Sequence, residues 1–243
     1  MRDGITTLAV IGDVHAHWAR LGRVLDRIAR EDVDGILLVG DLGHPSVRPG
    51  RPDFGVRTRY LESVEEVLRR VRDLGKPIAW VPGNHDLPEV PGEDNVDGRV
   101  GDVAGLRVHG IGGAGPERFG FAYEWGEDEI RSREEPACDV LLCHAPPANT
   151  DLDWVPTSHA HVGSEAIRER AQRHRGVLVC GHIHESPGAV LLGDCICLNV
   201  GGLGEPWGRA QVGFVRWNPA GGHEVVHEDL EDEVVRSWGG GLG

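Results

Sequence analysis

Several features that mark other classes of protein are missing from this chain of 243 residues. No apolar run approaches the roughly 20 residues that a membrane-spanning helix requires, so we expect no membrane span. Met1 is followed almost at once by a strand-like run, without the apolar region and cleavage site of a secretory signal. Together these absences predict a cytoplasmic protein.

Cysteine is also scarce: the chain has five, an odd number. Most of them, including Cys143 and Cys180, lie inside apolar runs. A framework of disulfides is therefore not expected, and a reducing compartment is favoured. We interpret Cys143 and Cys180 as core residues, because neither forms a convincing Cys/His dyad.

Positive charge is under-represented, since 25 Lys and Arg residues oppose 39 Asp and Glu residues for a net charge of −14. Such a surface repels a phosphate backbone, so tight nucleic-acid binding is not expected, whereas metal cations are not repelled. Lys76 is the only lysine, and the glycine-rich run Gly110–Gly115 therefore lacks the lysine of a P-loop. We interpret that run as a loop near the cleft.

The first third of the chain alternates strand and helix patterns. Ile5–Ile11, Ile36–Val39 and Pro77–Val81 are short apolar runs typical of buried strands. Between them, the apolar spacing predicts helices over Trp18–Arg30 and Arg57–Leu74. This β-α-β-α-β order favours parallel strands with right-handed crossovers and predicts an α/β fold.

The middle of the chain is less regular, but the same patterns continue. Strands are predicted at Leu106–Ile111, Val140–Cys143 and Val177–Cys180, and helices at Glu127–Glu135 and Ser164–Arg173. A long loop is expected between Ala145 and Val162.

The last third has mostly strand character. Strands at Ala189–Leu192, Ile196–Val200 and Gln211–Trp217 are predicted to form an antiparallel meander. The acidic run Glu224–Glu233 is predicted to be a solvated edge strand. Because no linker or repeat interrupts the chain, we expect one domain over residues 1–238 and a glycine-rich tail over residues 239–243.

Side chains that bind metal ions follow the carboxyl ends of the predicted strands, in the sequences GDVHAH, GD, PGNHD, CHAPP and GHIH. The candidate ligands are Asp13, His15, Asp41, Asn84, His144, His182 and His184. In open α/β sheets this edge is where ligands bind, so we expect the side chains to converge.

The types of ligand indicate which ions would bind. Carboxylates, imidazoles and an amide oxygen suit Mn, Fe or Zn better than Ca. The set is too large for one ion, and if Asp41 bridges two, they lie about 3.5–4 Å apart, a spacing used for displacement at phosphorus. Each motif alone has a structural explanation as a turn or cap. All of them together would then bury several charges without partners, which is very costly.

Taken in order, the motifs resemble the calcineurin-like metallophosphoesterase superfamily, whose signature is D-x-H, G-D, G-N-H-D/E, H and G-H-x-H. The resemblance implies a four-layer α/β/β/α sandwich of two mixed sheets flanked by helices. It also implies two divalent metal ions, with Mn favoured over Fe or Zn. One ion would be held by Asp13, His15, Asp41 and His184, and the other by Asp41, Asn84, His144 and His182.

The same resemblance implies roles for the residues of the third motif. His85 would donate a hydrogen bond or a proton to the phosphoryl oxygens or the leaving group, and Asp86 would orient its ring. Asn84 would contact both metal and phosphate. The nucleophile would be a metal-bound hydroxide that attacks phosphorus in line.

Histidines outside the signature are left with two interpretations each. His44 stands where many relatives have an acidic residue, and it either reaches the substrate phosphate or caps the loop before Pro45. His159 and His161, in the loop after His144, either line the cleft or are solvated.

The function expected from the resemblance is hydrolysis of a small, nucleotide-like phosphodiester. The stretches DLDWVP, HVGSEAIRE and GVLVCGHIHESPG are similar to a subgroup that contains small archaeal and bacterial phosphoesterases and vertebrate metallophosphoesterase-domain proteins. Phosphomonoesterase or protein phosphatase activity at the same site is the alternative. From a different class, a non-catalytic scaffold with the same fold is a further alternative.

Overall fold

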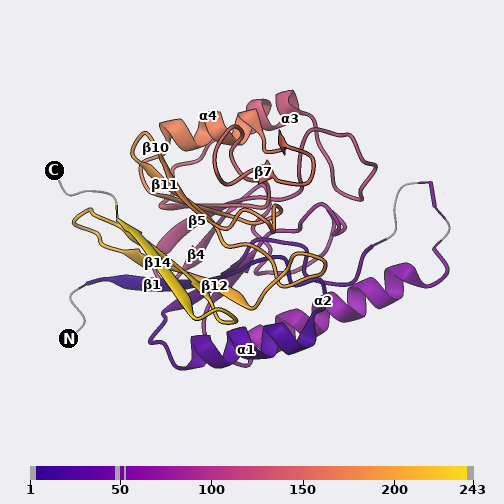
Figure 1. The fold of residues 1–243 in the computed structure, drawn as a ribbon, viewed down its shortest axis with the longest axis horizontal. Coiled ribbons are helices and arrows are strands. Elements are labelled where there is room, and N and C mark those ends of the chain that lie inside the picture. Colours follow the sequence, from indigo (N-terminus) through magenta and orange to yellow (C-terminus); the bar gives the residue numbers. More distant parts are fainter. Residues whose placement is uncertain (1–3, 47–49, 52, 240–243) are drawn as a thin grey trace.

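Two six-stranded mixed sheets face each other, and helices cover the outer face of each (Figure 1). This arrangement is seen in a computed structural model that describes residues 4–46, 50–51 and 53–239. The fold class expected from the sequence, an α/β/β/α sandwich, is confirmed.

The first sheet has the strand order β14-β13-β12-β1-β2-β3. Its β1, β2 and β3 strands are parallel, and β12, β13 and β14 are added to β1 in antiparallel fashion. Helices α1 and α2 cover its outer face (Figure 1). The bounds are β1 Thr6–Ile11, α1 Trp18–Ala29, β2 Gly35–Leu38, α2 Val56–Arg72, β3 Ile78–Trp80, β12 Gln211–Trp217, β13 Glu224–Asp229 and β14 Val234–Gly239.

The second sheet has the order β10-β11-β9-β6-β5-β4, in which β5, β6, β9 and β11 are parallel and the two edge strands are antiparallel. Helices α3 and α4 cover its outer face (Figure 1). The bounds are β4 Val100–Val103, β5 Leu106–Ile111, α3 Glu127–Ser132, β6 Val140–Cys143, α4 Glu165–Arg173, β9 Val177–Cys180, β10 Gly188–Leu192 and β11 Cys195–Asn199. A short ribbon of β7 Trp154–Val155 and β8 Ala160–His161 lies in the predicted long loop.

The apolar side chains form three clusters, one at each interface between neighbouring layers. Strand β1 shows how one strand serves two of them: Ala9 and Ile11 pack toward the helices, whereas Leu8 and Val10 pack toward the second sheet. Side chains alternate across a strand, so a strand buried on both faces is apolar throughout. The free cysteines Cys143 and Cys180 are buried in the third cluster, as predicted.

Two predictions for the last third of the chain are wrong. The antiparallel meander does not form, because β11 pairs in parallel with β9 in the second sheet and β12 belongs to the first. The acidic run does not form an edge strand either: β13 lies between β12 and β14, which is itself the edge. Local apolar patterning identifies strands but does not assign them to a sheet.

The predicted glycine-rich tail is only partly described. Gly239 is the last residue of β14, and residues 240–243 of the tail lie outside the described residues.

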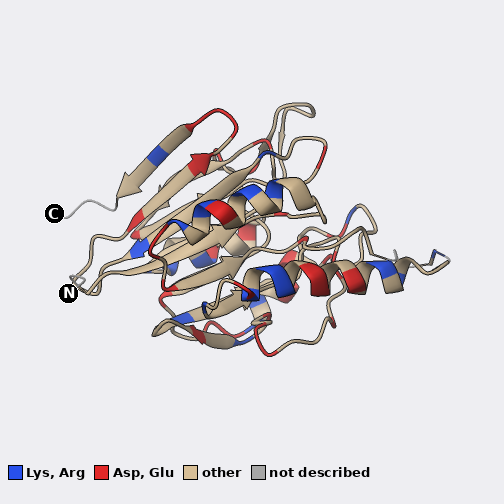
Figure 2. Cartoon of the chain, turned by 90° about the horizontal axis from the view of Figure 1, so that it is seen from below, with Lys and Arg blue, Asp and Glu red and all other residues tan. Residues whose placement is uncertain are grey.

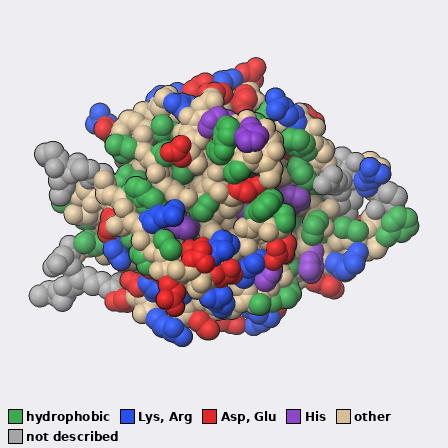
Figure 3. All heavy atoms as spheres, in the orientation of Figure 1, with side chains coloured by type: hydrophobic (Ala, Val, Ile, Leu, Met, Phe, Trp, Pro, Cys, Tyr) green, Lys and Arg blue, Asp and Glu red, His purple; other side chains and the backbone are tan. Residues whose placement is uncertain are grey.

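Charges of both signs are interspersed over the surface. Acidic and basic residues both occur along the helices in Figure 2, and the face in Figure 3 shows both kinds side by side. Among the described residues, no helix is long and apolar enough to cross a bilayer.

Candidate metal centre

The predicted ligands come from both sheets and meet at one edge of the sandwich. In the first sheet, β1 is followed by Asp13 and His15, β2 by Asp41 and β3 by Asn84. In the other sheet, β6 is followed by His144, and β9 by His182 and His184. Two groups have all their ligand atoms within 4.8 Å of one another: Asp13, His15 and His184, and Asp13, Asp41 and His144.

Asp13 is fully buried and fixed by contacts from the second sheet. Both of its carboxylate oxygens accept a hydrogen bond from the backbone N–H of His182 at 3.1 Å, and Oδ1 lies 3.3 Å from His184 Nε2. Burial raises the pKa of Asp13, but the hydrogen bond and charge of His184, together with His144 and His15, outweigh this and hold that pKa well below its usual range. Asp13 is therefore a buried anion at the interface of the two sheets.

Asp41 lies between two histidines. Its Oδ2 is 3.5 Å from His15 Nε2 and 3.8 Å from His144 Nε2, while its Oδ1 accepts a hydrogen bond from the backbone N–H of His85 at 2.9 Å. Burial and the neighbouring carboxylates of Asp86 and Asp13 raise the pKa of Asp41 well above its usual value. This cluster of buried carboxylates favours the binding of cations.

His144 and Asn84 present lone pairs to each other, and His182 lies next to them. Nδ1 of His144 lies 2.8 Å from the Val39 carbonyl, which only accepts, so that nitrogen carries the proton. Burial lowers the pKa of His144 and keeps its ring neutral, which leaves Nε2 as a second acceptor. Nε2 is 2.9 Å from Asn84 Oδ1, which in turn lies 3.1 Å from His182 Nδ1. Acceptors that face each other in a buried site fit a cation between them.

The remaining ligand, His15, is also neutral. Burial lowers its pKa to about 3 despite the attraction of Asp13, so its ring nitrogens have a lone pair to offer. In contrast, the hydrogen bond and charge of Asp13 raise the pKa of His184 above its usual value, although burial acts in the opposite direction. Apart from this pair, the imidazoles are in the form that binds metal ions.

The backbone that carries the ligands is strained. His15, Asp41 and His182 all have left-handed φ angles, of 45°, 50° and 68°, which are uncommon for residues other than glycine. Strain of this kind persists only where the surroundings enforce it, and it is concentrated at functional sites. At Gly83 there is also no room for a Cβ, because it would overlap the Asp41 carboxylate.

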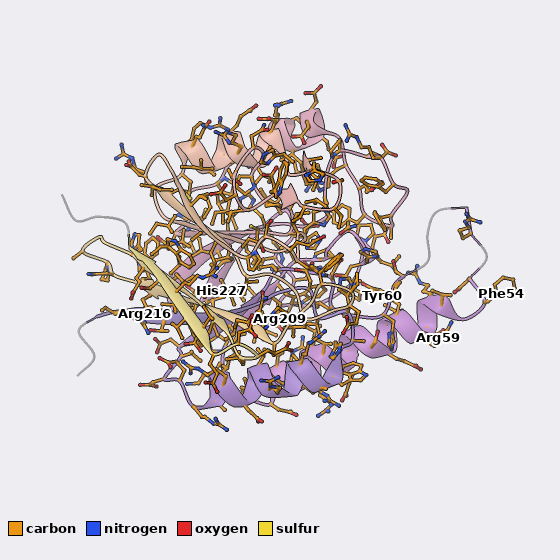
Figure 4. All side chains as sticks on the ribbon, viewed as in Figure 1. Phe54, Arg59, Tyr60, Arg209, Arg216 and His227 are labelled. Atoms are coloured by element: carbon orange, nitrogen blue, oxygen red, sulfur yellow. The ribbon has the colours of Figure 1, made fainter. Side chains whose placement is uncertain are left out.

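Hydrogen bonds to Asp86 and Tyr60 hold the loop that carries His85. Asp86 Oδ2 accepts hydrogen bonds from the backbone N–H groups of Gly83 at 2.8 Å and Leu42 at 3.3 Å. The hydroxyl of Tyr60, which lies on α2 (Figure 4), bonds to Asp86 and accepts the N–H of Leu87 at 3.1 Å. Burial raises the pKa of Asp86 to about 6. The predicted orientation of the His85 ring by Asp86 stays a prediction.

Sequence reasoning missed Tyr60 and Phe121. Tyr60 belongs to the buried stripe of α2, and its role depends on a loop 27 residues further along the chain. Phe121 packs its ring against His85, with centroids 4.4 Å apart, and the ring centroid of His15 lies 5.3 Å from that of His85. No local signal in the sequence places Phe121 there.

The histidines outside the signature lie in different settings. His44 is exposed, its backbone N–H donates to Ser63 Oγ at 2.8 Å, and its ring contacts that of Trp18. His161 lines a cavity that reaches Asn84 and His182, and its Nδ1 is 2.7 Å from Asp153 Oδ1. Of the two interpretations of His161, the cavity wall is therefore the one that the structure favours.

Comparison with known proteins identifies relatives for most of the chain. A family model described as calcineurin-like phosphoesterase matches residues 6–186. An uncharacterised protein of Methanocaldococcus jannaschii is 29% identical over 184 residues, which are 70% of this chain and 78% of that protein.

A second relative has a named activity. The cAMP/cGMP dual specificity phosphodiesterase of Mycobacterium tuberculosis is 28% identical over 194 residues, which are 72% of this chain and 56% of that protein. The chain thus spans about half the length of that relative. Among solved structures, a protein of Thermus thermophilus superposes with a TM-score of 0.59 at 15% identity, over 96% of this chain and 98% of that one, a likeness in fold.

Proposed function

Because the chain belongs to the calcineurin-like phosphoesterase family, we propose that it hydrolyses a small phosphodiester at the candidate metal centre. The observation that carries this proposal is the position of Asp41 Oδ2 between the ring nitrogens of His15 and His144. A carboxylate oxygen with an imidazole on either side is suited to bridge two cations. Paired cations are the arrangement that supports in-line displacement at phosphorus.

Two sets of side chains would hold these cations. They are Asp13, His15, Asp41 and His184 for one, and Asp41, Asn84, His144 and His182 for the other. When bound, the cations supply a Lewis acid for the phosphoryl oxygens and a water of lowered pKa. The mixture of carboxylate, imidazole and amide oxygen favours Mn²⁺, with Fe and Zn²⁺ as alternatives.

We assign to His85 the role of acting on the leaving group. Its backbone N–H donates to Asp41, so the carboxylate between the two cation positions also fixes the loop of His85. As water bonds to phosphorus and the ester P–O bond breaks, a proton on the His85 ring passes to the departing oxygen. Asn84 would contact the phosphate, and Asp86 would act through the loop as a positioning residue. His44 is retained as a candidate phosphate contact.

Two cavities that reach the centre support a diester over a monoester. One, of about 470 Å³, touches Asn84 and His182; the other, of about 440 Å³, touches His184 and includes Trp207. A phosphodiester carries two ester groups, and each cavity has room for one. The named activity of the mycobacterial relative agrees with this choice.

The cytoplasmic location stays a prediction.

The test is hydrolysis of bis-p-nitrophenyl phosphate and p-nitrophenyl phosphate by protein supplied with Mn²⁺. We expect the diester to be the better substrate, and His85→Ala and Asp41→Asn to lower turnover by at least about 100-fold. His223→Ala serves as the control, because that ring stacks on Trp217 at the opposite end of β1.

Three results would contradict the proposal. Unchanged turnover in both variants would refute the mechanism, and faster hydrolysis of the monoester would favour the phosphomonoesterase alternative. Absence of Mn²⁺ binding in a calorimetric titration would favour the scaffold alternative.

A further inference from the structure

The larger of the two cavities has an aromatic wall. The loop between Ala114 and Glu124 carries Phe119, whose side chain is 64% exposed, and Phe121. Both line the cavity that reaches the predicted ligands Asn84 and His182. A large apolar side chain left exposed at the mouth of such a cavity marks a contact surface for a ligand.

The rings form a continuous row that ends at the catalytic candidate. The ring centroid of Phe119 is 6.0 Å from that of Phe121, and the ring of Phe121 is 4.4 Å from that of His85. A planar group attached to a phosphate near His85 would therefore extend along these ring faces. Aromatic groups associate favourably at such distances.

The loop that presents Phe119 is held in place by hydrogen bonds within the loop itself. The carboxylate of Glu124 accepts hydrogen bonds from three successive backbone N–H groups, those of Arg118, Phe119 and Gly120, at 3.3, 3.1 and 2.9 Å. A platform that is already ordered loses less conformational entropy on binding. The exposed ring is therefore an organised feature of the cavity.

The charges around the cavity disfavour a second phosphate. Glu124, Glu127 and Glu165 line it, against a single arginine, Arg118. Glu127 is fixed by the hydroxyl of Ser164 and Glu165 by the side chain of Asn149, so neither carboxylate is positioned by a cation. An additional phosphate would meet like charges, whereas a neutral planar group would not.

We propose that this cavity is a subsite for a neutral, planar aromatic group of the phosphoester, a nucleobase or an aryl ring, with Phe119 as the residue on which it stacks. This inference rests on the proposed function. It adds the chemical class of the substrate and names the residue that selects it.

The test measures binding rather than turnover, with phosphonates that cannot be hydrolysed. Calorimetric titration of Mn²⁺-loaded protein would compare ethylphosphonate, phenylphosphonate and an acyclic adenine phosphonate. We expect the aromatic ligands to bind more tightly than ethylphosphonate by about tenfold, as for a base stacked on an aromatic side chain. The adenine and phenyl ligands distinguish a nucleobase from a general aryl group.

Substitutions of single residues show which side chain causes the preference for aromatic ligands. Phe119→Ala is expected to abolish the preference and leave the affinity for ethylphosphonate unchanged, whereas Phe119→Trp keeps it. Phe54 provides a matched control: it is 87% exposed and projects from the outer end of α2 (Figure 4), outside the residues of the cavity, so Phe54→Ala retains the preference.

Two outcomes overturn the inference and leave the proposed function intact. One is equal affinity of the wild-type protein for all three ligands. The other is a preference that survives Phe119→Ala and is lost in Trp207→Ala, which would place the aromatic group in the other cavity. Failure to hydrolyse bis-p-nitrophenyl phosphate is a separate result, which tests the proposed function and not the position of the aromatic group.

Discussion

The carboxylate of Asp13 packs against the Cα of Gly181 so closely that a Cβ at residue 181 would overlap Oδ2. Asp13 follows β1 of one sheet, and Gly181 follows β9 of the other. The glycine of the GHIH motif therefore lets the two sheets approach at the point where their ligands meet.

Replacing this glycine should impair metal binding. Gly181→Ala forces Asp13 to move, and we expect the affinity for Mn²⁺ to fall by about 10- to 100-fold, as when a group that orients a ligand is lost. Calorimetric titration measures the change. The control is Gly22→Ala in α1, where the added methyl meets nothing within 4 Å and the helix should be stabilised by up to about 1 kcal/mol. Equal Mn²⁺ affinity in both variants would show that Asp13 is not a ligand.

Divalent cations should stabilise the fold. The buried carboxylates and facing lone pairs of the centre repel one another, and a cation placed among them removes that cost. At 100 times the dissociation constant, Mn²⁺ should add about 2.7 kcal/mol to the free energy of unfolding. Thermal unfolding with Mn²⁺ or with EDTA measures this. His144→Ala should lose the increase in Tm and His223→Ala should keep it; an increase of the same size in both would argue against the site.

The Tyr60 hydroxyl should matter for both stability and turnover. Tyr60→Phe removes the hydroxyl to which the N–H of Leu87 donates and one of the hydrogen bonds to Asp86, which costs about 1–3 kcal/mol. Because the affected loop carries His85, we expect kcat to fall as well. In the matched variant Tyr123→Phe, which removes a hydroxyl bonded to Asp97 at 2.7 Å, stability should fall without a change in kcat. Urea unfolding and steady-state kinetics separate the two effects, and an unchanged kcat in Tyr60→Phe would contradict the positioning role.

Mild acid should destabilise the protein through His227. Burial lowers the pKa of this ring to about 4, despite the attraction of Asp229, from the ordinary 6.5 that applies in the unfolded chain. Between these values the unfolded chain binds a proton that the folded protein does not. The contribution of His227 to the free energy of unfolding is therefore fully present above pH 6.5. It falls as the pH decreases toward 4, by about 1.4 kcal/mol per pH unit at most. Urea unfolding at several pH values should show a smaller slope for His227→Gln than for the wild type; identical slopes would refute this cause.

Many of the helices and strands were predictable, because the spacing of apolar residues within each element identifies it. The apolar run of β1 and the spacing of Leu21, Val24 and Ile28 in α1 identify their elements without reference to the rest of the chain. The assignment of β12 to the first sheet was not predictable, since it depends on pairing with β1, about 200 residues earlier in the chain. The same holds for β14, whose exposed, short pattern is stabilised by its pairing with β13.

The sequence by itself determined which side chains are candidate ligands, because parallel strands place their carboxyl ends at one edge and the motifs follow those ends. Only the tertiary structure decided that Asp13 and Asp41 from one sheet meet His144, His182 and His184 from the other. It also decided that Tyr60 supports Asp86 and that Phe121 covers His85. These contacts join residues far apart in the chain, and their geometry follows from the packing of two sheets and their helices, which no local pattern encodes.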